Sequence, residues 1–272
     1  MAQYCRYVGE FKTGKNVKQV TNHALQFACS HPQGPVYLMG AREVMEEIVE
    51  PKEIKQDLWE PVELAGLPES RVKEIADALV DAREPLVITG YAGRNHKWPA
   101  AIVELANTIK GLRVLDTGGC DMCFPADHPS WLGFRFSVSP AIETADVILV
   151  VDCDVPWINV HNTPNENSRI FHIDLDPLKQ MMPVFYIGAL RRYRADSLLA
   201  IQQITSYLKK DEASQLKLVS QESATDGIIF SCRTSRGLQP LRPLLCHTKM
   251  GPLASISLPN NYATCVRGIL SG

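Results

Sequence analysis

Between Ser70 and Lys210 the sequence alternates short, continuously apolar runs with segments that carry one apolar helical face. Each run is apolar at nearly every position, so a strand formed by it must be buried on both faces of a sheet. Parallel strands separated by helices meet that requirement, because the helices cover the sheet. We therefore predict an α/β fold, a doubly wound, Rossmann-like parallel sheet over residues 70–210. Its strands should cover most of 86–89, 113–116, 147–151 and 170–174.

The region before this domain has a different pattern. Residues 1–50 contain an amphipathic helix at 17–30 and a short apolar strand at 35–39. They are predicted to be a fragment of another α/β domain. Residues 51–69 combine prolines and acidic side chains without periodicity, which is typical of an interdomain linker.

The region after the domain loses both periodicities. Prolines and serines recur over residues 211–272, and from Gly227 onward there is no Asp or Glu. We expect an irregular tail, either disordered or translated from sequence that was never selected to fold.

Composition excludes several kinds of partner. The formal net charge is -2, so no overall field attracts nucleic acid, and no apolar run reaches the roughly 18 residues of a membrane span. We expect neither nucleic acid nor membrane as a partner. The N-terminus lacks the apolar core of a secretory signal, and eight cysteines follow no framework spacing. This pattern predicts free thiols and a cytoplasmic location.

The junction after the first predicted strand of the domain holds Gly90 and Gly93. Glycines at such a turn allow backbone N–H groups to approach a phosphate at a helix N-terminus. Asp116 ends the next strand, where an acidic side chain can bind a ribose hydroxyl. The alternative is that any strand-to-helix turn of this fold favours glycine, because the full GxGxxG pattern is absent.

Other polar residues give weaker signals. Four acids stand at the C-terminal ends of strands, where they could bind ribose hydroxyls or cap the following turns: Asp152, Asp154, Asp174 and Asp176. Cys120 and Cys123 have the spacing of a zinc-binding pair, but a second pair is missing, which favours incidental loop cysteines. No Ser/His/Asp order or carboxylate pair indicates a catalytic set. We predict neither a catalytic residue nor a metal ligand in this chain.

Three stretches together resemble one family. They are HPQGPVYLMGAREVMEE at His31–Glu47, DHPSWLGF at Asp127–Phe134 and RIFHIDLDP at Arg169–Pro177. In order and spacing they are similar to the thiamine-diphosphate-dependent, acetolactate-synthase-like enzymes. The resemblance implies that residues 1–50 close a pyrimidine-binding domain and that residues 70–210 form the central domain.

The family resemblance implies thiamine diphosphate and Mg²⁺ as cofactors, a 2-oxo acid substrate and a homo-oligomer. Its chemistry is the formation or cleavage of C–C bonds, including decarboxylation, by transferases or lyases. The family's activating glutamate matches no residue here. Its Gly-Asp-Gly metal pattern is also missing, the nearest text being Thr225-Asp226-Gly227. We therefore expect a truncated chain that lacks the thiamine site and is inactive alone.

The resemblance also raises a second cofactor. The family's central domain binds FAD in acetolactate synthases, ADP in some relatives and nothing in others. Candidate contacts for such a nucleotide are Gly90, Gly93, Thr117 and Asp174. However, Phe134–Ser137 (FRFS) replaces the family's Gly-Met-x-Gly loop, and Cys153–Trp157 (CDVPW) replaces its Arg-Phe-Asp-Asp-Arg turn, which argues against FAD.

Two rival hypotheses stay open. The chain is either a non-catalytic remnant or partner subunit that kept the central fold, or a stand-alone domain that binds FAD, ADP or NAD directly. The first 50 residues favour the thiamine enzyme lineage, because a stand-alone nucleotide-binding domain does not need them.

Overall fold

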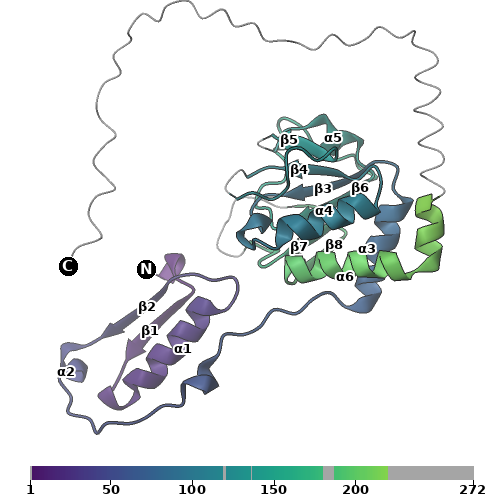
Figure 1. Cartoon of the computed structure of the whole chain (residues 1–272). Coiled ribbons are helices and arrows are strands. Elements are labelled where there is room, and N and C mark those ends of the chain that lie inside the picture. The colour runs from purple at the N-terminus through teal and green to yellow at the C-terminus, as the bar shows by residue number, and fades with distance from the viewer. Residues whose placement is uncertain (1, 119–120, 136, 180–186, 220–272) are drawn as a thin grey trace, which may run out of the picture. The chain divides into compact units, whose positions relative to one another are not determined.

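The computed structural model describes residues 2–118, 121–135, 137–179 and 187–219 (Figure 1). Within them, two structured regions follow each other along the chain. An N-terminal segment contains two strands, and a larger central domain contains six. None of the helices in the described part has the length and apolar character that a membrane span requires.

The central domain is built on a parallel sheet with the strand order β5-β4-β3-β6-β7-β8. The strands are β3 (Pro85–Thr89), β4 (Arg113–Asp116), β5 (Trp131–Phe134), β6 (Val147–Val151), β7 (Arg169–Asp174) and β8 (Arg191–Arg194). Every pairing is parallel. The order is that of a Rossmann fold, whose first strand lies between the second and the fourth. The predicted fold class and the four predicted strands are confirmed.

Two hydrophobic cores lie on opposite faces of this sheet. Along β6, Val147, Leu149 and Val151 belong to one core, and Ile148 and Val150 belong to the other. Successive side chains of a strand point to opposite faces, so a strand that is apolar throughout serves both cores.

Three helices cover the first face: α3 (Glu69–Asp81), α4 (Trp98–Thr108) and α6 (Ser197–Lys210). Figure 1 shows them along the same side of the sheet. The second face packs against the short helix α5 (Pro140–Thr144) and against loop residues such as Trp157 and Ile187.

Sequence patterns missed the two edge strands. In β8 all four residues are arginine or tyrosine and none is buried, so no apolar run marks the strand. Edge strands carry charge because only one neighbour pairs with them. In β5 a glycine with φ +101° (Gly133) and an irregular register with β4 interrupt the pattern.

We predicted that the chain becomes irregular at residue 211, but it does not. Residues 212–219 are helical, the N–H of Ser214 donates to the Asp211 carboxylate at 2.9 Å, and Leu218 is buried in the first core. The expectation of an irregular tail is therefore wrong over 212–219. The remainder of that predicted tail, 220–272, lies outside the described residues.

The N-terminal segment is a βαβ unit. Strands β1 (Tyr7–Phe11) and β2 (Val36–Gly40) pair in parallel, and α1 (Val17–Cys29) connects them. Tyr7 stacks on Phe27 of α1 with ring centroids 4.9 Å apart, which holds the helix on the strand pair. The short helix α2 (Arg42–Met45) follows. Residues 51–64 contain a single 3₁₀ turn, Gln56–Trp59, and no other helix or strand.

We expect Leu149→Ala and Ile148→Ala each to lower the free energy of unfolding by about 2–5 kcal/mol, because each leaves a cavity in a different core. Both side chains are fully buried. Urea unfolding followed by circular dichroism measures the two losses. A change within about 0.5 kcal/mol for either variant would show that its face of the sheet is not a packed core.

Candidate functional site

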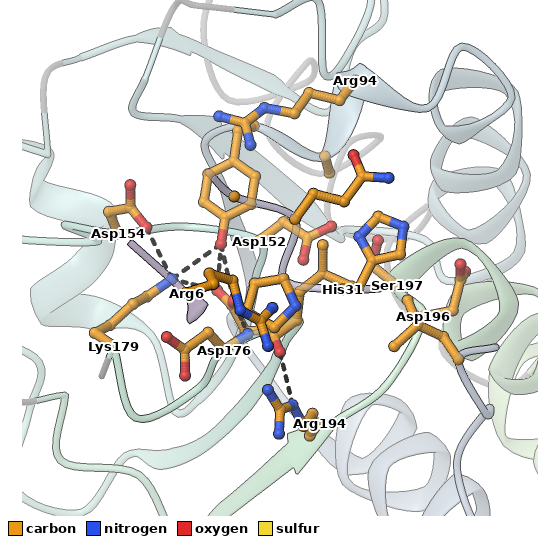
Figure 2. A pocket seen from close by; sticks show the side chains of 18 of the residues that line it. Arg6, His31, Arg94, Asp152, Asp154, Asp176, Lys179, Arg194, Asp196 and Ser197 are labelled. Carbon is orange, nitrogen blue, oxygen red and sulfur yellow. Dashed lines mark hydrogen bonds and ion pairs between the residues drawn. The ribbon is translucent and has the colours of Figure 1, made fainter. Parts of the chain in front are cut away.

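The candidate site lies at the carboxyl edge of the central sheet, where β3 and β6 are neighbours. In open α/β sheets this is the point at which the strand order reverses and ligands bind. A pocket opens there. Its lining from the central domain includes Tyr91 after β3, Asp152 and Asp154 after β6, and Asp174 and Lys179 at and after β7. Figure 2 shows this pocket from close by.

Four of these residues form a connected cluster, which we call the Lys179 network: Lys179, Tyr91, Asp154 and Asp174. The Lys179 ammonium lies 2.6 Å from Asp174 Oδ2, 2.8 Å from Asp154 Oδ1 and 2.9 Å from the Tyr91 hydroxyl. In Figure 2 its side chain points toward Asp154. The Tyr91 hydroxyl is 2.8 Å from both oxygens of Asp174 and donates to this carboxylate.

Asp174 and Lys179 are the deeply buried members of the network. The side chain of Asp174 is 0% exposed and that of Lys179 is 7% exposed. Burial opposes ionisation of both groups, but their mutual attraction outweighs it. The pKa of Asp174 is lowered to about 2, with His172 and Lys179 as the stabilising neighbours, and the pKa of Lys179 is raised by Asp174 and Asp154. Both groups are therefore charged at neutral pH.

Tyr91 stays protonated beside these charges. Burial, and then the negative charge of Asp174, raise its pKa far above the usual range of a phenol. The hydroxyl is thus a permanent donor to Asp174, and it accepts from the Lys179 ammonium.

Asp152 is the least satisfied acid of the edge. Its side chain is buried, and among the described residues Oδ1 has no hydrogen-bond partner. Burial raises the pKa of Asp152 to about 7, and the negative charge of Asp174 acts in the same direction. Its backbone has φ +44°, a left-handed conformation that residues with a Cβ rarely adopt. Such unsatisfied and strained residues cluster at functional sites.

The four residues predicted to contact a nucleotide do gather at this edge, but internal contacts occupy them. The N–H groups of Gly90 and Tyr91 donate to the Asp152 carbonyl at 3.2 and 2.9 Å. A Cβ on Gly93 would collide with the backbone carbonyl of Met122, so packing explains that glycine.

Thr117 and Asp174 complete the predicted set. The Thr117 hydroxyl donates to the Thr89 carbonyl at 3.2 Å and lies 3.0 Å from the Cys153 sulfur. Asp174 belongs to the Lys179 network. Nucleotide binding by these four residues stays a prediction. Their internal contacts argue against it.

The remaining sequence candidates have structural roles. Asp116 accepts the N–H of Gly118 at 3.2 Å, and Asp174 accepts the N–H of Asp176 at 2.8 Å. Cys123 is a buried free thiol whose pKa burial raises to about 11, and Cys120 lies outside the described residues. No group of three or more His, Cys, Asp or Glu side chains in the described ranges could hold a metal ion.

Sequence reasoning missed Lys179 and Tyr91, the donors of the network. A single lysine in a loop is usually solvated, and a tyrosine after a strand gives no special signal. The only available hint was the surplus of acids at the strand ends, because buried carboxylates need a cation nearby.

Replacing Lys179 by Met keeps most of the aliphatic stem and removes the ammonium. The fully buried Asp174 then loses its counter-ion, so we expect the free energy of unfolding at pH 7 to fall by about 3 kcal/mol. Lys209→Met is the matched control, because Lys209 pairs with Glu104 and both side chains are about half exposed. It should cost less than about 1 kcal/mol. Equal losses in urea unfolding would contradict the importance of the buried pair.

Asp152→Asn should alter how stability depends on pH. Because folding raises the pKa of Asp152, its stabilising contribution is complete below about pH 4 and is lost as the pH rises through about 7. Asn cannot ionise and also tolerates a positive φ. The variant should therefore gain up to a few kcal/mol over wild type between pH 4 and pH 8, at about 1.4 kcal/mol per pKa unit. Unfolding free energies measured at several pH values would contradict this if the two curves ran parallel.

Comparison with known proteins relates part of the chain to a family model. Residues 72–182 match the family model described as thiamine pyrophosphate enzyme, central domain. No curated protein sequence matches the chain. Five of the six parallel strands of the central domain, β3 to β7, lie within the matched residues, and β8 follows them.

Two solved structures are similar in fold. The benzoylformate decarboxylase from Polynucleobacter necessarius is 20% identical with a TM-score of 0.58, over 74% of this chain and 38% of that one. The thiamine diphosphate-dependent 4-hydroxybenzoylformate decarboxylase from Rhodococcus jostii RHA1 is also 20% identical with a TM-score of 0.58, over 76% and 40%. The chain thus spans about two fifths of the length of these structures. The strand order and the family match agree: residues 72–182 are similar to the central domain of the thiamine pyrophosphate enzymes.

Proposed function

We propose that this chain contributes the central domain to a thiamine-diphosphate-dependent enzyme that acts on 2-oxo acids. The observation that supports this function is the match of residues 72–182 to the family's central domain, on a parallel sheet with the corresponding fold. The reaction class is the formation or cleavage of the C–C bond beside the 2-oxo group. The two similar structures are decarboxylases by name, which favours cleavage with loss of carbon dioxide over the acetolactate-type condensation that the sequence resemblance suggests.

Thiamine diphosphate supplies a nucleophilic carbon for the substrate carbonyl, and Mg²⁺ anchors its diphosphate through oxygen ligands. The described residues do not fit Mg²⁺. They hold no metal-binding group, and the acids Asp154 and Asp174 are already paired with Lys179. We assign the thiamine site to other domains of the assembled enzyme and a supporting role to the central domain.

Three further features of the enzyme are part of this proposal. We expect a homo-oligomer, because the family resemblance implies a cofactor bound between subunits. We expect the 272-residue chain to be inactive alone, because it has no match to the family's glutamate or to its metal pattern. A cytoplasmic location also stays a prediction, and it agrees with the free thiols of Cys5, Cys29, Cys123 and Cys153.

The test compares two proteins. One is the chain as given. The other is a fusion in which residues 66–219 replace the central domain of the Polynucleobacter decarboxylase, whose own flanking domains supply the thiamine site. Both are mixed with thiamine diphosphate, Mg²⁺ and benzoylformate, and carbon dioxide is measured. We expect release that depends on both cofactors from the fusion and none from the chain alone, because positioned groups account for much of the barrier lowering.

Circular dichroism and size-exclusion chromatography first establish that the fusion is folded. Turnover by the chain alone that disappears when thiamine diphosphate is removed would overturn the assignment of the site to other domains. A folded fusion that binds no thiamine diphosphate would overturn the assignment of residues 66–219 as a central domain.

A further inference from the structure

A nucleotide held at the carboxyl edge of a Rossmann-like sheet needs unoccupied backbone N–H groups after the first strand. Its diphosphate usually binds where a helix N-terminus follows a glycine turn. In this chain the Gly90 and Tyr91 N–H groups already donate to the Asp152 carbonyl. A diphosphate would have to displace these bonds, which hold the turn after β3 to the turn after β6.

The segment that follows the turn offers no helix N-terminus in its place. A 3₁₀ turn at Ala92–Arg94 intervenes, and α4 begins only at Trp98. The Trp98 N–H donates to the Asn95 carbonyl at 2.8 Å, and the next residue, Pro99, has no N–H. The helix that should face the phosphate therefore starts too late and with its first donors used.

The charge at this edge also opposes an anion. Asp152, Asp154 and Asp174 lie together, and the Lys179 ammonium already binds two of them. A diphosphate would meet carboxylates whose counter-ion is spent, and repulsion between like charges is strong in a partly buried site. The Lys179 ammonium already supplies the positive charge that Asp154 and Asp174 need.

Tyr91 lines the pocket and contacts two of its cations. Its hydroxyl contacts Asp174 and Lys179, and the Arg94 guanidinium stacks on its ring, 4.6 Å from the centroid. In Figure 2 Arg94 lies at the top of the view and Lys179 at the lower left.

The segment Cys153–Trp157, which departs from the family pattern, takes part in this closure. Asp154 pairs with Lys179, Cys153 contacts the Thr117 hydroxyl, and Trp157 is buried in the second core. The turn that replaces the family's Arg-Phe-Asp-Asp-Arg thus supplies an acid for the internal lysine.

We propose that the Lys179 network occupies the edge at which a nucleotide would bind, so that the central domain of this chain binds neither FAD nor ADP and neutralises its edge carboxylates with its own cation. The FAD or ADP that the resemblance raised, with Gly90, Gly93, Thr117 and Asp174 as contacts, does not fit the structure. This inference concerns the central domain alone and does not depend on the thiamine chemistry proposed above.

The first experiment is equilibrium dialysis of the wild-type chain against FAD and against ADP at up to roughly millimolar concentration. We expect no saturable binding of either nucleotide. Saturable binding of FAD or ADP by the wild-type chain would overturn the proposal, because the proposal states that the central domain binds neither. This arm needs no variant to fold.

The second experiment empties the position of the cation. Lys179→Ala removes the ammonium and most of its stem and should lower the melting temperature. n-Butylammonium in the buffer should reverse at least half of the decrease in melting temperature, since it can place an ammonium between Asp154 and Asp174. Lys179→Arg keeps the positive charge, so it should lose less than Lys179→Ala and gain nothing from the amine. Lys209→Ala, which removes an exposed lysine, controls for general effects of the amine.

Failure of the amine to stabilise folded Lys179→Ala, or an unchanged melting temperature in that variant, would overturn the internal-cation assignment. If Lys179→Ala folds only when the amine is present during refolding, that result supports it. Neither outcome bears on the carbon dioxide assay of the fusion, so this inference and the proposed function fail separately.

Discussion

A parallel sheet that is buried on both faces leaves polar side chains almost nowhere to lie except at the ends of its strands. Asp116 and Asp174 are the last residues of β4 and β7, and Asp152 directly follows β6. Because all the strands run in the same direction, their acids collect at one edge. The fold thus concentrates negative charge in a half-buried place, and the rest of the site follows from how that charge is compensated.

Each acid is compensated in a different way. Asp116 accepts a backbone N–H of its own turn, and Asp174 holds the Lys179 ammonium and the Tyr91 hydroxyl. Asp152 has the weakest compensation, and its pKa rises to about 7 as a result. Two of the turns are strained, since Asp152 and Lys179 have φ values of +44° and +51°. Strain of this kind persists only where surrounding bonds over-determine the backbone. Here the same bonds that hold the turns also use the N–H groups that a phosphate would need.

The family match concerns the fold of the central domain, whereas the contacts at the sheet edge concern its site. The sheet and its strand order agree with the match of residues 72–182 to the model of the thiamine pyrophosphate enzyme central domain. Family membership does not decide whether that domain holds a second cofactor, because a fold supports many different sites. In this chain we propose that a few side chains in turns decide the question, above all Tyr91, Asp154 and Lys179.

The sequence by itself determined the class of fold. Runs such as VILVV (147–151) are apolar at every position, and only a strand covered on both faces satisfies that pattern. The sequence also marked the acids at the strand ends, because the apolar run that predicts a strand also shows which residue ends it. Strand β8 was invisible for the complementary reason: an edge strand is stabilised by its single neighbour and needs no apolar run. In β5 a glycine at positive φ interrupts the apolar pattern.

Only the tertiary structure decided what the acids do. Lys179 lies five residues after Asp174, but its other partners Tyr91 and Asp154 come from the turns after β3 and β6. Their meeting depends on the strand order, which no local pattern encodes. Strand β3 lies between β4, which follows it in the sequence, and β6, which is distant in the sequence. Local periodicity therefore reports which residues must be buried. Which buried charges become partners is set by the packing of distant turns at a shared edge.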